Sequence, residues 1–166
     1  MLAILSLVAA AAAFSMDYKV SKLNALAGEG AGAVNLNSEL FGRLVSTERN
    51  YTVMVVYTSL LKEHGCAFCH SLHPQIAFLA KSWSDASKPG FYFAFLEYKN
   101  AVDVFQKEGL TNVPVMKLFF PTTGTGPNVG KFIQEVPQTL YGASNTAWMQ
   151  KSSRHTSTAT SVWISS

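Results

Sequence analysis

The sequence predicts an α/β fold in which a central mixed sheet is flanked by helices, and three observations support that prediction. Strand-like runs of β-forming and apolar residues alternate with helix-like stretches between Val34 and Phe120. The 2 cysteines of the chain, Cys66 and Cys69, stand between a strand-like run and a helix-like run, where a redox dithiol belongs in a βα unit. Pro114 directly precedes another strand-like run, a position at which a strand tolerates proline.

The composition suits one domain. A chain of 166 residues that is 48% hydrophobic can bury a sizeable core. Its net charge of +3 is small, and no basic run is interleaved with aromatic residues. The composition therefore gives no reason to expect a nucleic-acid partner.

The first 15 residues are predicted to be a secretory signal peptide. Leu2 to Phe14 is apolar and rich in alanine, is interrupted only by Ser6, and is followed by small and polar residues. Cleavage is expected near Ala13 to Ser15. The segment is too short to span a bilayer, so no transmembrane helix is expected in this chain. A buried first helix is the alternative interpretation.

The elements before the cysteines follow from local patterns. Ser21 to Gly32 favours a short helix and a loop, and Val34 to Leu36 favours a short strand. Asn37 is suited to cap a helix over Ser38 to Val45. Tyr51 to Thr58 is almost continuously apolar or β-forming, as expected for a central strand that is covered on both faces.

After the cysteines, a helical stripe of apolar residues predicts a helix that contains Pro74 and ends near Trp83. The predicted domain covers residues 16–151, and the serine- and threonine-rich residues 152–166 are expected to be a disordered polar tail. The other elements expected in the domain are strands over Phe91 to Leu96, Val115 to Phe120 and Lys131 to Val136, and helices over Ala101 to Lys107 and Ser144 to Lys151.

The two cysteines are expected to act as a redox pair. If the helix begins at the motif, Cys66 lies in its first turn, where free N–H groups and the helix dipole favour thiolate over thiol. Cys66 is then the attacking sulfur. Cys69, one turn further on and facing the domain, can resolve a disulfide that Cys66 has formed.

Val113 and Pro114 form the second chemical element. A cis Val113–Pro114 bond would explain a proline at the start of a strand-like run. In that geometry the backbone of Val113 would lie beside the dithiol and could pair with an extended peptide. An ordinary trans proline in a loop is the alternative.

These features resemble known proteins. Cys66 and Cys69, with Pro74 five residues later and Val113-Pro114 before a strand, resemble the active-site set of the thioredoxin fold. A wider set of residues resembles the lumenal domain of the oligosaccharyltransferase oxidoreductase subunits, whose human members include the tumour suppressor candidate and magnesium transporter proteins. That set comprises Asn50-Tyr51-Thr52-Val53, Gly65-Cys66, Leu79-Ala80-Lys81-Ser82-Trp83, Phe91-Tyr92-Phe93-Ala94, Val104-Phe105-Gln106, Gly109-Leu110 and Phe119-Phe120-Pro121-Thr122.

The resemblance implies a thioredoxin-like domain in the lumen of the endoplasmic reticulum. There it would hold nascent, cysteine-containing polypeptides through a transient mixed disulfide, as part of the oligosaccharyltransferase complex, so that nearby asparagines are glycosylated first. Cys66 would be the nucleophile and Cys69 the resolver. Phe68, Val113 and Pro114 would face the client. The family continues into four transmembrane helices, whereas this sequence ends in a polar stretch.

Two further implications concern single positions. Thioredoxins often bury a carboxylate that assists proton transfer in the strand before the motif, and Val53 to Thr58 contains none, which favours slow client holding over rapid turnover. Asn50-Tyr51-Thr52 is an acceptor motif for N-glycosylation, with Asn50 as the modified residue.

Other site chemistries remain open at this point. Cys66-x-x-Cys69-His70 also fits c-type haem attachment, with His70 and either Met116 or Met149 as axial ligands. A visible absorption spectrum would reveal such a haem.

Zinc bound by Cys66, Cys69, His70 and His73 is disfavoured, since four ligands from one helix cannot easily surround an ion tetrahedrally. The strand-rich order of elements and Pro114 do not resemble a small helical cytochrome, so we expect neither a haem cofactor nor a metal. Besides His70 and His73, His64 is expected to face solvent.

The pair could also be a purely structural disulfide in a thioredoxin-like binding module.

Overall fold

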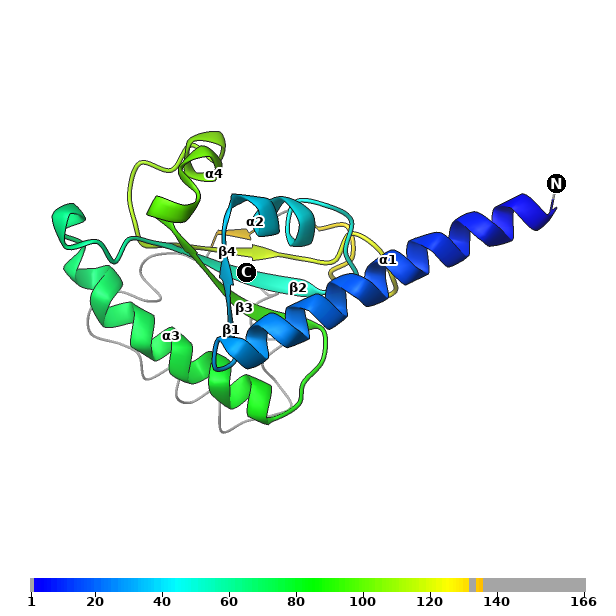
Figure 1. The fold of residues 1–166 in the computed structure, drawn as a ribbon, viewed down its shortest axis with the longest axis horizontal. Helices are drawn as coiled ribbons and strands as arrows, with labels where there is room; N and C mark the ends of the chain where they lie inside the picture. The colour runs from blue at the N-terminus through cyan, green and yellow to red at the C-terminus, as the bar shows by residue number, and fades with distance from the viewer. Residues whose placement is uncertain (1, 132–133, 136–166) are drawn as a thin grey trace.

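The computed structural model of the protein describes residues 2–131, 134 and 135. Helices and strands alternate along the chain as the sequence predicts (Figure 1). The elements are α1 (Leu2–Glu29), β1 (Ala33–Leu36), α2 (Ser38–Leu44), β2 (Thr52–Thr58), η1 (Lys62–His64), α3 (Ala67–Asp85), β3 (Phe91–Glu97), η2 (Tyr98–Asn100), α4 (Val102–Lys107), β4 (Val115–Phe119) and β5 (Gln134–Glu135).

The described strands form one mixed sheet in the order β1-β3-β2-β4-β5. Strands β1, β3 and β2 are parallel, whereas β4 pairs antiparallel with β2 and β5 pairs antiparallel with β4. The predicted α/β class is confirmed, and β2 has the predicted central place. The apolar side chains of β2 point to both faces of the sheet, and both faces are covered by helices.

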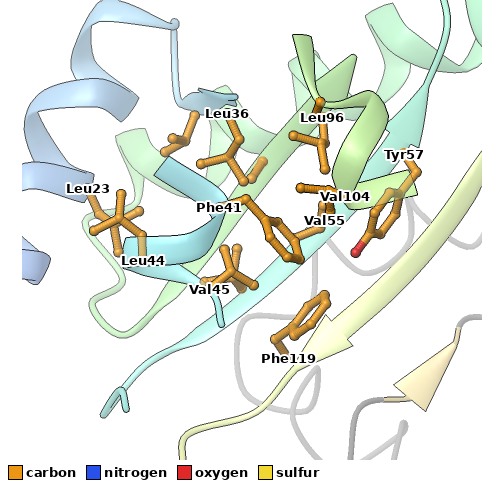
Figure 2. Close-up of a cluster of buried hydrophobic side chains, with 14 of the residues drawn as sticks. Leu23, Leu36, Phe41, Leu44, Val45, Val55, Tyr57, Leu96, Val104 and Phe119 are labelled. Carbon is orange, nitrogen blue, oxygen red and sulfur yellow. The ribbon is translucent and has the colours of Figure 1, made fainter. Parts of the chain in front are cut away.

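Two apolar clusters fill the space between the sheet and its helices. One lies on the side of α1, α2 and α4, where Phe41 packs edge-on against Tyr57 and Phe119 (Figure 2). The other lies under α3 and contains Leu72 and Ile76 from the predicted helical stripe. Helix α3 therefore stands alone on one face of the described sheet, with the two cysteines at its N-terminal end (Figure 1).

Helix α1 is longer than the short helix expected from Ser21. It runs unbroken across the predicted boundary at residue 15, because no glycine or proline interrupts the sequence before Gly28. Its C-terminal part packs on the sheet through Leu23 and Ala27. The signal peptide over residues 1–15 stays a prediction. Among the described residues, no helix combines the length and apolar character needed to cross a membrane.

The other predicted elements agree with the structure to within a few residues. Asn37 caps α2 as predicted, with its side-chain oxygen accepting the backbone N–H of Leu40 at 2.8 Å. The edge strand expected over 131–136 is present as the two-residue β5. The expected helix over Ser144 to Lys151 and the expected tail over 152–166 lie outside the described residues.

Candidate active site

A disulfide joins Cys66 to Cys69 at the start of helix α3. Cys66 is the N-cap residue, and Cys69 lies in the first turn. This placement agrees with the prediction that the helix begins at the motif. Cys66 is only partly buried, whereas Cys69 is 1% exposed. An incoming thiolate therefore reaches the Cys66 sulfur more easily than the Cys69 sulfur.

The start of α3 provides hydrogen-bond donors to the Cys66 sulfur. The backbone N–H of Cys69 donates to Cys66 Sγ at 3.1 Å. This N–H is one of the amides that have no partner within the helix at its N-terminus. When the disulfide is reduced, the same N–H and the helix dipole stabilise a thiolate at Cys66.

Val113 and Pro114 lie beside this disulfide. The Val113–Pro114 peptide bond is cis, as predicted. The carbonyl oxygen of Val113 is 3.6 Å from Cys66 Sγ, and Pro114 is buried just before β4. A disulfide sulfur has no proton to donate, so in the oxidised form this is a close contact and not a hydrogen bond. A backbone carbonyl thus borders the more accessible sulfur.

The loop between β2 and α3 is fixed by side chains near its two ends. Ser59 Oγ and His64 Nδ1 are 2.6 Å apart, and the His64 ring packs edge-on against Tyr98 at 5.4 Å between ring centroids. The backbone N–H of Leu60 donates to a carboxylate oxygen of Glu97 at 2.8 Å. These contacts hold the segment that leads into Cys66.

Phe68 and Asn50 occupy different environments. Phe68, in the first turn of α3, is partly buried and packs against the cluster under that helix. Asn50 is exposed in the loop before β2, on the surface where a glycan could be attached. A client contact at Phe68 and a glycan at Asn50 both stay predictions.

One histidine differs from expectation. His64 and His70 are exposed, as expected. His73 is partly buried, because its ring stacks on Phe95 of β3 with 4.1 Å between ring centroids and 24° between planes. Burial lowers the pKa of His73, while the carboxylate of Glu97 opposes that shift. The prediction that His73 faces solvent is therefore wrong. The sequence did carry a signal for this burial, because His73 follows Cys69, which was expected to face the domain, by four residues in the same helix.

The disulfide bears on the two alternative sites considered from the sequence, a haem attachment site and a zinc site. Both sulfurs are bonded to each other, so in this form neither provides a thiolate for zinc or a thioether link to haem. Of the proposed axial ligands, Met116 is buried in the cluster under α3, and Met149 lies outside the described residues. No group of three or more His, Cys, Asp and Glu side chains in the described part of the chain is arranged to hold a metal ion.

The fold and the site together define the class of protein. A mixed sheet with one helix that begins at a Cys-x-x-Cys disulfide, beside a cis-proline, is a thioredoxin-like domain. The structure of the first two thioredoxin domains of Eps1p from Naumovozyma dairenensis is similar, with a TM-score of 0.51 and 21% identity over 72% of this chain and 39% of that chain.

Sequence comparison gives the particular family. Residues 21–163 match the OST3/OST6 family, which is described as a transporter family, and the chain belongs to it. A relative in Danio rerio, the dolichyl-diphosphooligosaccharide–protein glycosyltransferase subunit MAGT1, is 35% identical over 55% of this chain and 28% of its own length. The subunit of the same name in Mus musculus is 31% identical over 66% of this chain and 33% of its own. The chain thus matches about a third of these relatives or less.

Proposed function

We propose that this chain is a thiol–disulfide active domain that holds client polypeptides through a mixed disulfide at Cys66. In the proposed reaction a client thiolate attacks Cys66 Sγ, the Cys66–Cys69 bond breaks, and Cys69 leaves as a thiolate, which then takes up a proton. When Cys69 attacks Cys66 in return, the disulfide of the domain forms again and the client leaves with its cysteine reduced.

The observation that carries this proposal is the difference between the two sulfurs. Cys66 is partly exposed and accepts a backbone N–H, whereas Cys69, to which it is bonded, is only 1% exposed. A client can therefore bond to Cys66, and Cys69 is the sulfur within the domain that can release it. We infer that Cys66 is the nucleophile and Cys69 the resolver.

A client peptide is proposed to lie along Val113. The carbonyl group of Val113, 3.6 Å from Cys66 Sγ, is placed to accept a backbone N–H from an extended client chain. Pro114 and the exposed part of Phe68 would border the same chain. A main-chain contact of this kind accepts many client sequences, because it does not depend on the side chains of the client.

The proposed setting is the oligosaccharyltransferase complex in the lumen of the endoplasmic reticulum. Family membership and the names of the MAGT1 relatives support this setting. The predicted signal peptide and the disulfide are consistent with an oxidising secretory compartment. Holding a client there would delay formation of its own disulfides, so that acceptor asparagines near its cysteines are glycosylated first.

The test is a pair of single-sulfur variants expressed in the secretory pathway. In Cys69→Ser the Cys66 thiolate can still attack a client disulfide, which forms a mixed disulfide and releases the other client sulfur as a thiolate. The variant should therefore accumulate adducts with cysteine-containing proteins that thiol reagents release, because the resolving attack is removed. Cys66→Ser is the matched control and should form none. Loss of the wild-type domain should lower glycosylation mainly at sites near client cysteines. Absence of adducts from Cys69→Ser, or unchanged occupancy at every such site, would contradict the proposal.

The reduction potential separates an exchanging disulfide from a structural one. A purely structural disulfide has a potential below about −300 mV, whereas a disulfide that exchanges with clients lies above that value. Equilibration of the whole chain with glutathione buffers measures it. A value below that limit would favour a binding module with a structural bridge.

A further inference from the structure

The resolving step requires a proton acceptor near Cys69. Cys69 attacks as a thiolate, yet its side chain is 1% exposed, and burial in apolar surroundings raises the pKa of a thiol. Water has little access to such a group. The adjacent strand β2 has the sequence TVMVVYT, which contains no acid or histidine.

His73 is placed to serve this thiol. It follows Cys69 by four residues in the same helix, so the two side chains are neighbours on the helix surface, with Cβ atoms about 5–6 Å apart. At about 100° per residue, His73 lies roughly 40° around the helix axis from Cys69. Stacking on Phe95 keeps its ring against the sheet and partly out of solvent.

Other described titratable groups near the site are less suitable. His70 is exposed and lies about 100° around the helix from Cys69. His64 Nδ1 is engaged with Ser59. The ion pair between Lys117 and Glu108 is partly buried, but Lys117 lies over Tyr57, which belongs to the cluster on the opposite face of the sheet.

We propose that His73 accepts the proton of the Cys69 thiol when Cys69 resolves a mixed disulfide, an inference that rests on the proposed function. As the imidazole of His73 takes the proton, the Cys69 sulfur attacks Cys66 Sγ. The Cys66–Cys69 bond forms and the bond from Cys66 to the client breaks. The client sulfur leaves with the electron pair of that bond as a thiolate, which takes a proton from solvent, so the client sulfur is reduced and the Cys69 sulfur oxidised.

The surroundings of His73 suit this role. Burial lowers the pKa of His73 below its usual value, so the ring is neutral and able to accept a proton near neutral pH. The carboxylate of Glu97 opposes the shift, and it therefore stabilises the imidazolium that forms. Glu97 is held in place by its hydrogen bond from the Leu60 backbone, while the neighbouring His70 contributes to lowering the pKa of His73.

The two sulfurs can be followed separately with one equivalent of 4,4′-dithiodipyridine. The whole chain is used in its reduced form, and its 2 cysteines are the only groups that react with this disulfide. Attack by Cys66 releases the first thiopyridone at a rate that depends on reagent concentration. Attack by Cys69 on the resulting mixed disulfide releases the second at a rate that does not.

His73→Phe should slow the second phase at least about tenfold near neutral pH and leave the first phase unchanged. Phenylalanine preserves an aromatic ring to stack on Phe95, so the fold should persist. His73→Gln, which removes the base but keeps a polar side chain, should give the same result. His70→Gln is the matched control and should change the second phase by less than about threefold, because His70 is exposed and lies about 100° around the helix from Cys69.

The pH profile separates proton transfer from a structural effect. With His73 present, the second phase should vary little with pH from roughly 6.5 to 8, because the acceptor is already neutral. In His73→Phe the rate should rise about tenfold per pH unit, following the thiolate fraction of Cys69. Equal second phases and parallel profiles in the wild type and both His73 variants would overturn the role of His73. A wild-type chain that releases only one thiopyridone would instead contradict the proposed function.

Discussion

Cys69 donates its backbone N–H to the sulfur of Cys66, the residue to which its own side chain is bonded, at 3.1 Å. One amide of the first turn thus favours negative charge on the outer sulfur, while burial disfavours charge on the inner one. The expected difference in reactivity between the two cysteines therefore has two sources, the first-turn amide that donates to Cys66 and the burial of Cys69.

The first prediction concerns these reactivities. In the reduced chain near neutral pH, a short pulse of iodoacetamide should alkylate Cys66 at least about tenfold faster than Cys69, since one pKa unit changes the thiolate fraction about tenfold. Mass spectrometry of the digested protein measures both sites. Equal and slow labelling would contradict the assigned roles.

The second prediction concerns Gly32, which lies between α1 and β1. A Cβ atom there would stand 2.6 Å from the Ala80 carbonyl oxygen of α3, and the φ angle of Gly32 is +99°. Gly32→Ala should therefore lower the free energy of unfolding by at least about 2 kcal/mol, as measured by urea denaturation. Gly42, inside α2 with open space around it, is the matched control. Gly42→Ala should leave stability unchanged or raise it by up to about 1 kcal/mol. Equal effects of the two changes would show that the contact with α3 is unimportant.

The third prediction compares two arginines. Arg49 is buried, donates to the carbonyl oxygens of Val45 and Thr47 at 2.6 Å and 3.2 Å, and lies over the Phe119 ring. Arg49→Ala should cost about 2–3 kcal/mol of stability, because the buried carbonyl of Val45 loses a charged donor. Arg43→Ala should lower stability by only about 0.5 kcal/mol, because Arg43 forms an exposed ion pair with Glu39. Thermal or urea unfolding measures the stability of both variants. A loss of stability in Arg49→Ala as small as that in Arg43→Ala would contradict the prediction.

The fourth prediction concerns stability in acid. Because burial lowers the pKa of His73 in the folded chain, the unfolded chain binds more protons than the folded chain as the pH falls. The contribution of His73 to stability is therefore retained above about pH 6.5 and is lost as the pH falls through the unfolded pKa towards the lower folded one. With the disulfide intact, wild-type Tm should drop between about pH 7.5 and about pH 5, and His73→Phe should drop less.

His70→Gln, which removes an exposed imidazole from the same helix, is the control for that measurement. It should keep the wild-type loss of Tm in acid. If His73→Phe and the wild type lose Tm equally, the ring of His73 is not a source of the acid sensitivity.

The sequence by itself determined the features that depend on neighbouring residues. The alternation of strands and helices, the cap at Asn37, the start of α3 at the cysteines and the place of Pro114 before a strand all follow from residues a few positions apart. Such patterns act through backbone propensity and side-chain periodicity, which are local properties of the chain. They also placed β2 at the centre of the sheet, because an apolar strand requires cover on both faces.

Only the tertiary structure decided which distant residues meet. The spacing of His73 from Cys69 was visible in the sequence, but the stacking of His73 on Phe95 depends on how α3 lies across β3. The burial of Arg49 and the close approach of Gly32 to Ala80 likewise depend on the packing of elements separated by tens of residues. Helical periodicity fixes which side chains share a face, whereas the packing of the whole domain fixes what that face touches. For this reason the sequence indicated the cysteine pair at the start of a helix, and the fold placed Val113 beside Cys66 and the ring of His73 against the sheet, one turn beyond Cys69.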